Sequence, residues 1–429
     1  MGCCVRSEDN IKIAIIGMGY VGLPLAVEFA KKYSVVGFDI SRRRIAELQS
    51  GLDCTNEVSE SDLLNASHLL FTDQKNDLIG VNVFIVTVPT PINDSNQPNF
   101  EPLISASNLV GELIRPGDVI IYESTVYPGA TEEVCIPRLE RASGLILNTD
   151  FSVGYSPERI NPGDKQHTVR DITKVTSASN PRAALFVDNL YSSVITAGTH
   201  LAPSIKVAEA AKVIENIQRD VNIALINELS IIFNRLDIDT YDVLAASATK
   251  WNFLRFEPGL VGGHCIGVDP YYMTHKAQAV NVFPQMILAG RRTNELMSEF
   301  ISAKLIKKMI SEGISVSGAT VLVLGYTFKE NCPDIRNTKV EDLTRQLVEF
   351  GMAVDVYDPW FEDSWAVSHE QVKFVSEAQD SAYDAIILTV PHDQFLELGP
   401  EAIRCFGKER HVFFDLKSRF QVDDSDLRL

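Results

Sequence analysis

The chain has 429 residues, which is too long for one compact core and predicts two or three domains. Its 57 acidic and 39 basic residues give a formal net charge of -18, which disfavours nucleic acid and anionic membrane surfaces as partners. An anionic substrate therefore needs a locally basic pocket.

The seven cysteines form neither a CxxC pair nor the Cys/His spacing of a metal site, and their odd number argues against a disulfide framework. Since the sequence also has no signal peptide and no membrane-length apolar run, we expect a soluble cytoplasmic protein without a metal. Residues 1–10 are predicted to be a disordered tail. Its start resembles an acylation site, but Arg6 stands where the myristoylation pattern needs Ser or Thr.

An apolar run at 11–16 is followed by a glycine turn and a helical pattern at 25–32. In such a turn the first glycine permits the bend, the second admits a pyrophosphate, and the third lets the helix pack on the strand. A second strand, 35–38, ends at Asp39, where a carboxylate binds the ribose diol. This order predicts a dinucleotide-binding domain. The turn residues are Gly17, Met18, Gly19, Tyr20, Val21 and Gly22.

Arg42, Arg43 and Arg44 follow Asp39 and could be taken for a clamp on a 2′-phosphate. The Asp39 carboxylate would repel that phosphate, so NAD is favoured over NADP. We expect one arginine, Arg44, to lie over the adenine. The alternative, for at least two of the three, is an exposed position at the start of a helix.

Two further apolar strands, 83–88 and 119–122, end in polar turns, and ligands of open parallel sheets lie beyond such strand ends. The next strand, 151–155, leads into a loop that sets an acid beside a base. We expect this loop to be functional, although an ordinary surface loop is the alternative. The expected cofactor contacts are Val88, Pro89, Thr90, Ser124 and Thr125, and the loop residues are Glu158, Arg159 and Ile160.

Residues 204–236 contain no Gly or Pro and show helical spacing, which predicts one helix of about 50 Å. A helix of this length is expected to link two α/β lobes and to supply a dimer surface. On it, Lys212 and Asn216 share one face and can reach a common ligand. A solvated polar stripe is the alternative.

The stretch 259–272 sets Cys265 among glycines, with Asp269 four residues on. Gly259 and Gly262 allow the backbone to come close to a ligand, so this loop can fix a nucleophile. A buried structural cysteine is the alternative.

Strands at 321–324, 354–357 and 385–390 repeat the order of the first domain but lack its glycine turn. Lys329 is expected to meet the phosphates of another nucleotide, and Arg336 to reach toward the first cofactor. The fold class is therefore α/β, with two doubly wound Rossmann-like domains joined by a long central helix and a helical middle domain. The expected segments are a tail (1–10), an NAD-binding domain (11–200), a helical dimerisation domain with the cysteine loop (201–312) and a second Rossmann-like domain for another nucleotide (313–429).

With these motifs in order, the chain resembles the UDP-glucose/GDP-mannose dehydrogenase family of nucleotide-sugar 6-dehydrogenases over essentially its whole length. It is most similar to the UDP-N-acetylglucosamine and UDP-N-acetylgalactosamine enzymes of capsular and Vi-type polysaccharide synthesis, which carry the same Gly-Gly-His-Cys-Ile-Gly-Val-Asp-Pro stretch. UDP-glucose enzymes typically carry Lys in place of Val268 and often a second glutamate near Pro162.

The resemblance implies a four-electron oxidation of a C6 alcohol through a Cys265 thioester, with two NAD⁺ used in turn. By analogy, Lys212 and Asn216 stabilise oxygen charge, and Asp269 orients Lys212 and a water. Glu158 is the expected base for hydrolysis, with Thr125 holding the water. The implied substrate contacts are Glu158, Arg159, Ile160, Lys212, Asn216, Arg255, Gly259, Gly262 and Lys329, with Arg291 or Arg292 as further partners for the diphosphate.

Other readings stay open at this point. A UDP-glucose or UDP-ManNAc 6-dehydrogenase would differ only in the sugar. A β-hydroxyacid dehydrogenase shares the Lys-x-x-x-Asn helix but removes one hydride and needs no cysteine, and a nucleotide-sugar sensor would bind without chemistry. The expected partners are a UDP-sugar and a second copy of the chain.

Overall fold

The computed structural model describes residues 11–93, 95–160, 167–263, 266–361 and 371–429. The chain divides into two compact units. One joins Met1–Glu215 with Tyr271–Val282, and the other joins Asn216–Pro270 with Phe283–Leu429. Among the described residues, every helix is too short or too polar to cross a bilayer.

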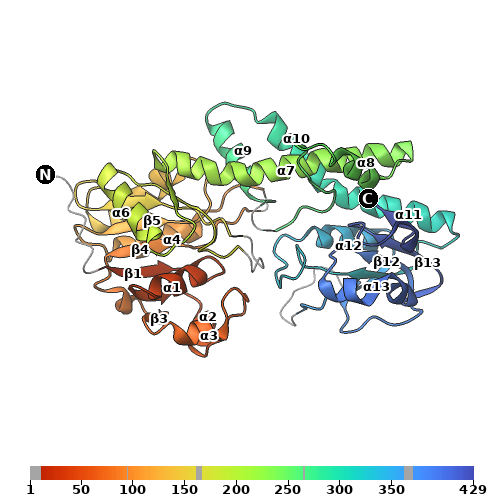
Figure 1. Ribbon diagram of the computed structural model, residues 1–429, viewed down its shortest axis with the longest axis horizontal. Helices are drawn as coiled ribbons and strands as arrows, with labels where there is room; N and C mark the ends of the chain where they lie inside the picture. The colour runs from red at the N-terminus through yellow and green to blue at the C-terminus, as the bar shows by residue number, and fades with distance from the viewer. Residues whose placement is uncertain (1–10, 94, 161–166, 264–265, 362–370) are drawn as a thin grey trace. The chain divides into compact units, whose positions relative to one another are not determined.

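The first unit is built on a six-stranded parallel sheet with the order β3-β2-β1-β4-β5-β6 (Figure 1). The chain winds one way from β1 to β3 and the other way from β4 to β6, so the topological switch lies between β1 and β4. Every residue of β4 and β5 is buried, as expected for central strands of a parallel sheet. The strands are β1 (Lys12–Ile16), β2 (Ser34–Phe38), β3 (Leu69–Thr72), β4 (Val83–Val86), β5 (Val119–Tyr122) and β6 (Ser152–Tyr155).

Local signals in the sequence set the helix ends of this unit. The side chains of Ser41 and Asn180 accept backbone N–H bonds at the starts of α2 and α6. Helix α5 ends at Gly144, whose φ of 71° favours glycine. The helices are α1 (Gly22–Ala30), α2 (Arg42–Gln49), α3 (Glu60–Asn65), α4 (Glu101–Gly111), α5 (Ile136–Ser143) and α6 (Pro181–Ser192), and β7 (Lys174–Thr176) pairs with β8 (Thr199–Leu201).

The second unit contains a sheet with the equivalent order, β11-β10-β9-β12-β13-β14, and this confirms the predicted repeat. Its strands are β9 (Thr320–Leu324), β10 (Ala353–Tyr357), β11 (Val372–Phe374), β12 (Tyr383–Leu388), β13 (Gly407–Asp415) and β14 (Leu427–Arg428). Its helices are α8 (Thr240–Ser247), α10 (Gln285–Glu295), α11 (Met297–Ser311), α12 (Lys339–Glu349) and α13 (Asp393–Cys405).

The first turn of each sheet contains the same set of hydrogen bonds. In each, a glycine after the first strand donates its N–H to the last residue of the second strand, and the following aspartate accepts from the next backbone N–H. A threonine directly after the fourth strand in chain order donates to the carbonyl of that glycine. The equivalent residues are Gly17 and Gly325, Asp39 and Asp358, and Thr87 and Thr389.

Helix α7 (Ile205–Leu236) runs unbroken for 32 residues, which confirms the predicted long helix (Figure 1). It contributes residues to both units, as does α9 (Asp269–Ala279). The predicted strands lie within two residues of the observed ones. Helix α1 begins at Gly22, three residues earlier than predicted, because it starts directly at the last glycine of the turn.

Candidate functional site

The glycine turn after β1 has the backbone geometry that a close approach to a ligand requires. Gly17 has a φ of 105°, and a Cβ on Gly22 would lie 1.9 Å from the carbonyl oxygen of Gly17. A Cβ on Gly19 would meet no heavy atom within 4 Å. The turn is therefore tight where the helix packs on the strand and open where a pyrophosphate is expected.

Asp39 follows β2, and backbone donors hold its carboxylate. Its Oδ2 accepts from the N–H of Met18 at 2.8 Å, and its Oδ1 accepts from the N–H of Ser41 at 2.8 Å. The carboxylate lies at the edge where a ribose diol is expected, so these residues fit NAD.

Arg44 supports the same turn from behind. Its Nε donates to the carbonyl of Met18 at 2.7 Å, and the guanidinium forms a buried ion pair with Asp53 at 2.7 Å. Arg42 and Arg43 remain exposed, as expected for two of the three arginines. A contact of Arg44 with adenine stays a prediction, since the guanidinium already has partners within the chain.

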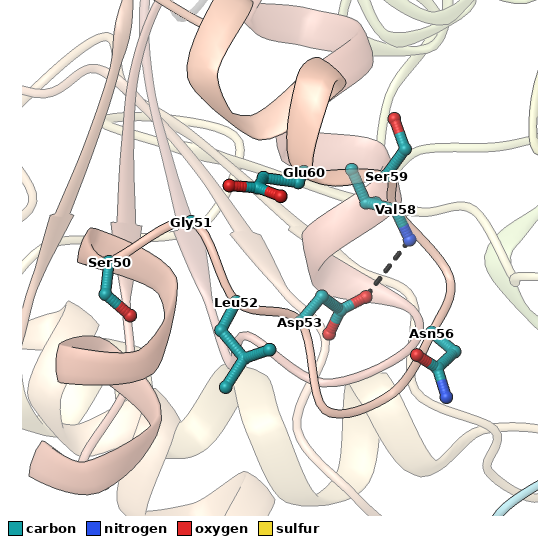
Figure 2. Close-up of a pocket in the computed structure, with 8 residues that line it drawn as sticks. All are labelled: Ser50, Gly51, Leu52, Asp53, Asn56, Val58, Ser59 and Glu60. Atoms are coloured by element: carbon teal, nitrogen blue, oxygen red, sulfur yellow. Dashed lines mark hydrogen bonds between the residues drawn. The ribbon is translucent and has the colours of Figure 1, made fainter.

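Asp53 belongs to a turn that forms a surface pocket of about 410 Å³. Figure 2 shows its carboxylate directed at the backbone N–H of Val58, at 3.0 Å. The carboxylate also accepts from Arg44, Thr55 and Glu57, so all of its hydrogen-bonding capacity serves the turn. The pocket is lined by Ser50, Gly51, Leu52, Asp53, Asn56, Val58, Ser59 and Glu60, and thus by none of the predicted site residues.

The turns after β4 and β5 are tied together, as their expected role at one ligand edge requires. The Ser124 hydroxyl donates to the carbonyl of Val88 at 2.5 Å, and the Thr90 hydroxyl donates to the carbonyl of Thr125 at 2.8 Å. Tyr272 on α9 donates to the carbonyl of Thr90 at 3.0 Å. These contacts bring the expected nicotinamide-side residues together.

Glu158 lies in a buried charge network that sequence reasoning missed. Its Oε2 accepts from Nζ of Lys174 at 2.6 Å, and the same Nζ donates to Oε2 of Glu123 at 2.7 Å. Burial raises the pKa of Glu123 to about 7. Burial also acts to raise the pKa of Glu158, but Lys174 and the N–H groups of Arg159 and Ile160 outweigh it and leave that pKa lowered. The available signal was a lysine inside the β-branched stretch 172–176.

Arg159 was expected to counter the substrate diphosphate. In the structure its guanidinium pairs with Glu215 on α7 at 2.7 Å and donates to the carbonyl of Thr173 at 2.9 Å. A ligand phosphate would have to compete with this pair.

The buried polar side chains of helix α7 include Glu209, Lys212 and Asn216. Asn216 donates to Oδ2 of Asp269 at 2.5 Å, a contact that the sequence did not predict. Glu209 accepts from the N–H groups of Gly129 and Thr131, and burial raises its pKa to about 7. The pairing of Lys212 with Asp269 remains a prediction.

Cys265 and its neighbour His264 lie outside the described residues, but the glycines before them have defined contacts. The N–H and C=O of Gly259 both bond to the amide of Asn227, at 2.8 and 3.0 Å. A Cβ on Gly262 would lie 2.7 Å from the carbonyl oxygen of Asn337, and one on Gly263 would lie 2.8 Å from the ring of Phe328. Glycine is therefore required where this loop packs on the segment 328–338.

That segment carries Lys329, and a buried pair, Asp358 and His392, forms hydrogen bonds with its backbone and with the two residues before it. Asp358 accepts from the N–H groups of Tyr326 and Thr327 at 2.6 and 3.1 Å, and His392 lies 3.2 Å from it. Nδ1 of His392 accepts from a backbone N–H at Asn331, at 2.9 Å. Lys329 is half-buried within this loop.

The remaining arginines have different surroundings. Arg255 is exposed, and the guanidinium of Arg336 forms three hydrogen bonds with Asp334, of which the two from Nε are 3.0 and 3.1 Å long. Arg291 does not fit the expected diphosphate contact, because its fully buried side chain pairs with Asp220 at 2.6 Å. In the described part of the chain, no cluster of three His, Cys, Asp or Glu side chains could hold a metal ion.

Three models of one family match the chain in order. They are its NAD binding domain at residues 11–195, its central domain at 206–296 and its UDP binding domain at 322–421. The match therefore covers both sheets, α7 and the cysteine loop.

Two curated relatives are similar over nearly their whole length. The chain is 59% identical to a UDP-N-acetyl-D-glucosamine 6-dehydrogenase of Pseudomonas aeruginosa, covering 98% of this chain and 100% of the relative. It is 56% identical to the enzyme of the same name from Salmonella typhi, covering 98% and 99%. A solved UDP-D-ManNAc dehydrogenase of Pyrococcus horikoshii superimposes with a TM-score of 0.87 at 30% identity, covering 97% and 98%. On these grounds the chain belongs to the UDP-glucose/GDP-mannose dehydrogenase family, whose first domain binds NAD.

Proposed function

We propose that the chain oxidises the C6 hydroxyl of a UDP-N-acetylhexosamine, UDP-GlcNAc or UDP-GalNAc, to the uronic acid. The observation that carries this substrate class is the 59% and 56% identity to two UDP-N-acetyl-D-glucosamine 6-dehydrogenases over their whole length. The UDP binding domain of the family fits the same substrate class.

The reaction removes four electrons, and NAD⁺ supplies the hydride acceptor twice. The first hydride leaves C6 as its hydroxyl loses a proton, which yields an aldehyde. The Cys265 thiolate adds to the aldehyde carbon, and loss of a second hydride from this thiohemiacetal leaves a thioester. Water then displaces the thiol and releases the carboxylate.

We assign the supporting roles to further residues of the chain. Lys212 and Asn216 stabilise negative charge on the C6 oxygen, and Asp269 fixes Asn216 by the hydrogen bond between them. Glu158 accepts the O–H of the hydrolytic water, with Thr125 beside it. Lys329 and Arg255 are the proposed cationic partners of the diphosphate.

We also propose a homodimer or higher homo-oligomer that works in the cytoplasm, where its thiols stay reduced, and supplies uronic acids for surface polysaccharides. The domain assignment is an NAD-binding domain (11–200), a helical domain with the cysteine loop (201–312) and a UDP-sugar domain (313–429).

Stoichiometry tests this function directly. We expect two NADH for each sugar consumed, measured by absorbance against product quantified by mass spectrometry. In Cys265→Ser, turnover to the uronic acid should be lost while NAD⁺ binding persists. One NADH per sugar, unchanged in Cys265→Ser, would instead identify a two-electron dehydrogenase.

Initial rates with four sugars side by side test the substrate class. UDP-GlcNAc or UDP-GalNAc should give the highest kcat/KM, with UDP-ManNAc and UDP-glucose below them. A preference for either of the last two would move the enzyme to another branch of the family.

A further inference from the structure

We propose that Lys174 is a positioning residue that holds Glu158 ionised and aimed for hydrolysis of the acyl-enzyme. The inference rests on the proposed function, since Glu158 acts on a thioester only in that scheme. It assigns a role to a lysine that lies in β7.

Hydrogen bonds occupy every oxygen of the two carboxylates, Glu158 and Glu123. Nζ of Lys174 donates to Glu158 at 2.6 Å and to Glu123 at 2.7 Å. The second oxygen of Glu158 accepts the N–H groups of Arg159 and Ile160, at 2.6 and 2.9 Å, and the second oxygen of Glu123 accepts the hydroxyl of Tyr191. Every carboxylate oxygen in this network therefore has a donor, and the orientation of Glu158 is fixed.

The two carboxylates differ in their exposed fraction. The side chain of Glu158 is 7% exposed, whereas the side chain of Glu123 is fully buried and that of Lys174 is 2% exposed. Of the two carboxylates that share the ammonium, only Glu158 reaches a surface from which it can meet a water. Glu123 thus serves as an internal counter-charge.

The buried network holds more acidic than basic groups. Two carboxylates face one ammonium, and two such groups cannot both ionise freely when buried together. The proton that the network retains belongs mainly to Glu123, whose pKa is raised by burial to about 7. Lys174 is itself held as the ammonium, because both carboxylates outweigh the effect of its burial on its pKa. Without Lys174, the carboxylates would retain more protons, and Glu158 would more often be neutral.

The test compares five variants under single-turnover and steady-state conditions. Lys174→Met removes the ammonium at nearly constant volume, and Lys174→Arg restores a cation. Lys174→Met/Glu123→Gln removes the ammonium together with the second carboxylate, and Glu123→Gln alone removes only that carboxylate. Glu158→Gln removes the proposed base.

In Lys174→Met we expect both hydride transfers to proceed, so that a burst of two NADH per active site is followed by slow turnover. Steady-state kcat should fall by on the order of ten- to hundredfold and recover as pH rises. Intact mass should reveal the sugar acyl group on the chain. Lys174→Arg should turn over faster than Lys174→Met, and Glu123→Gln alone, which keeps the Lys174–Glu158 pair, should not accumulate the acyl-enzyme.

The groups that face Glu158 and shape this pH profile are Lys174, Glu123 and Tyr191 from the neighbouring elements. Wild-type hydrolysis and an unshifted profile in Lys174→Met would overturn the inference. If Lys174→Met does not fold, the double variant Lys174→Met/Glu123→Gln decides by the same two readouts. Accumulation of the acyl-enzyme in Glu158→Gln, but in neither Lys174→Met nor Lys174→Met/Glu123→Gln, would reject the role of Lys174 and leave that of Glu158 standing. No acyl-enzyme in any variant, with one NADH per sugar in the wild type, would reject the proposed function itself.

Discussion

Two glycines of the turn after β1 have different surroundings, so one should affect the stability of the domain and the other its affinity for the cofactor. A Cβ on Gly22 would lie 1.9 Å from a backbone oxygen and 2.5 Å from Oγ1 of Thr87, whereas a Cβ on Gly19 would enter open space. The same substitution should therefore have different effects at two positions that lie one turn apart.

We expect Gly22→Ala to destabilise the protein by about 1–3 kcal/mol or more, since the helix must move away from the strand. Gly19→Ala should keep the wild-type melting temperature and weaken NAD⁺ binding, because its methyl group would occupy the path of the pyrophosphate. Thermal melting and calorimetric titration with NAD⁺ measure the two effects. A Gly19→Ala variant that binds NAD⁺ normally would argue against this placement of the pyrophosphate.

At the scale of elements, α7 is anchored to the first unit through a carboxyl group with a perturbed pKa. Burial raises the pKa of Glu209 from 4.5 to about 7. The folded chain therefore binds this proton more tightly than the unfolded chain. The resulting stabilisation is complete below about pH 4.5 and is lost as pH rises through about 7.

Glu209→Gln should remove this dependence, since an amide does not titrate. Relative to the variant, the wild type should lose up to about 1.4 kcal/mol of unfolding free energy per pH unit between about pH 5 and 7. Denaturant unfolding at several pH values gives the difference. Parallel curves for the two proteins would show that the Glu209 pKa is ordinary.

The loop that carries Lys329 depends on a second buried pair. His392 is completely buried, and its Nδ1 accepts the N–H of Asn331. In His392→Leu that N–H loses its acceptor and Asp358 loses a neighbour, at a cost of about 1–3 kcal/mol. We expect the affinity for UDP to fall by about tenfold or more, while NAD⁺ binds as before. Calorimetry with each nucleotide separates the two, and equal losses for both would indicate general unfolding.

At the scale of the whole molecule, the repeat of two sheets was predictable from the sequence because buried parallel strands are continuous apolar runs. The strand 119–122 was predicted at its observed ends. Charge partners were not predictable in this way. Lys174 on β7 meets Glu123, which is 51 positions away and directly follows β5, through the packing of two separate sheets and not through any local pattern. Arg291 was a reasonable phosphate ligand by residue type, but only the packing of α10 on α7 reveals its bond to Asp220.

The site was predictable to a similar degree. The glycine turn at Gly17 and the carboxylate of Asp39 were predicted from motif spacing, and in the structure Asp39 accepts the N–H of Met18. The hydrogen bond between Asn216 and Asp269 was not predicted, because the sequence favoured Lys212 as the partner of Asp269. The pair of Asp358 and His392 was missed, because a lone histidine after a strand carries no distinctive spacing.

Exposed apolar side chains bear on the assembly of the molecule. In the second unit, Phe283 and Met286 are 68% and 72% exposed and lie three positions apart. We expect Phe283→Ser/Met286→Ser to shift the protein toward a monomer in analytical ultracentrifugation. Ile40→Ser, at a site that is 88% exposed in the first unit, is the matched control and should leave the assembly unchanged. A wild-type sedimentation profile in the double variant would place the interface elsewhere.

Gly262 and Gly263 rest on Asn337 and Phe328, and those residues belong to the same stretch of backbone as Lys329. In the proposed function, Lys329 binds the diphosphate, so the backbone just before Cys265 packs on the segment that would contact the nucleotide end of the substrate. Binding of the uridine diphosphate should therefore order this segment before oxidation begins. A free hexose lacks the nucleotide and would leave the segment without a ligand, so we expect a lower kcat as well as a weaker affinity than for the nucleotide sugar.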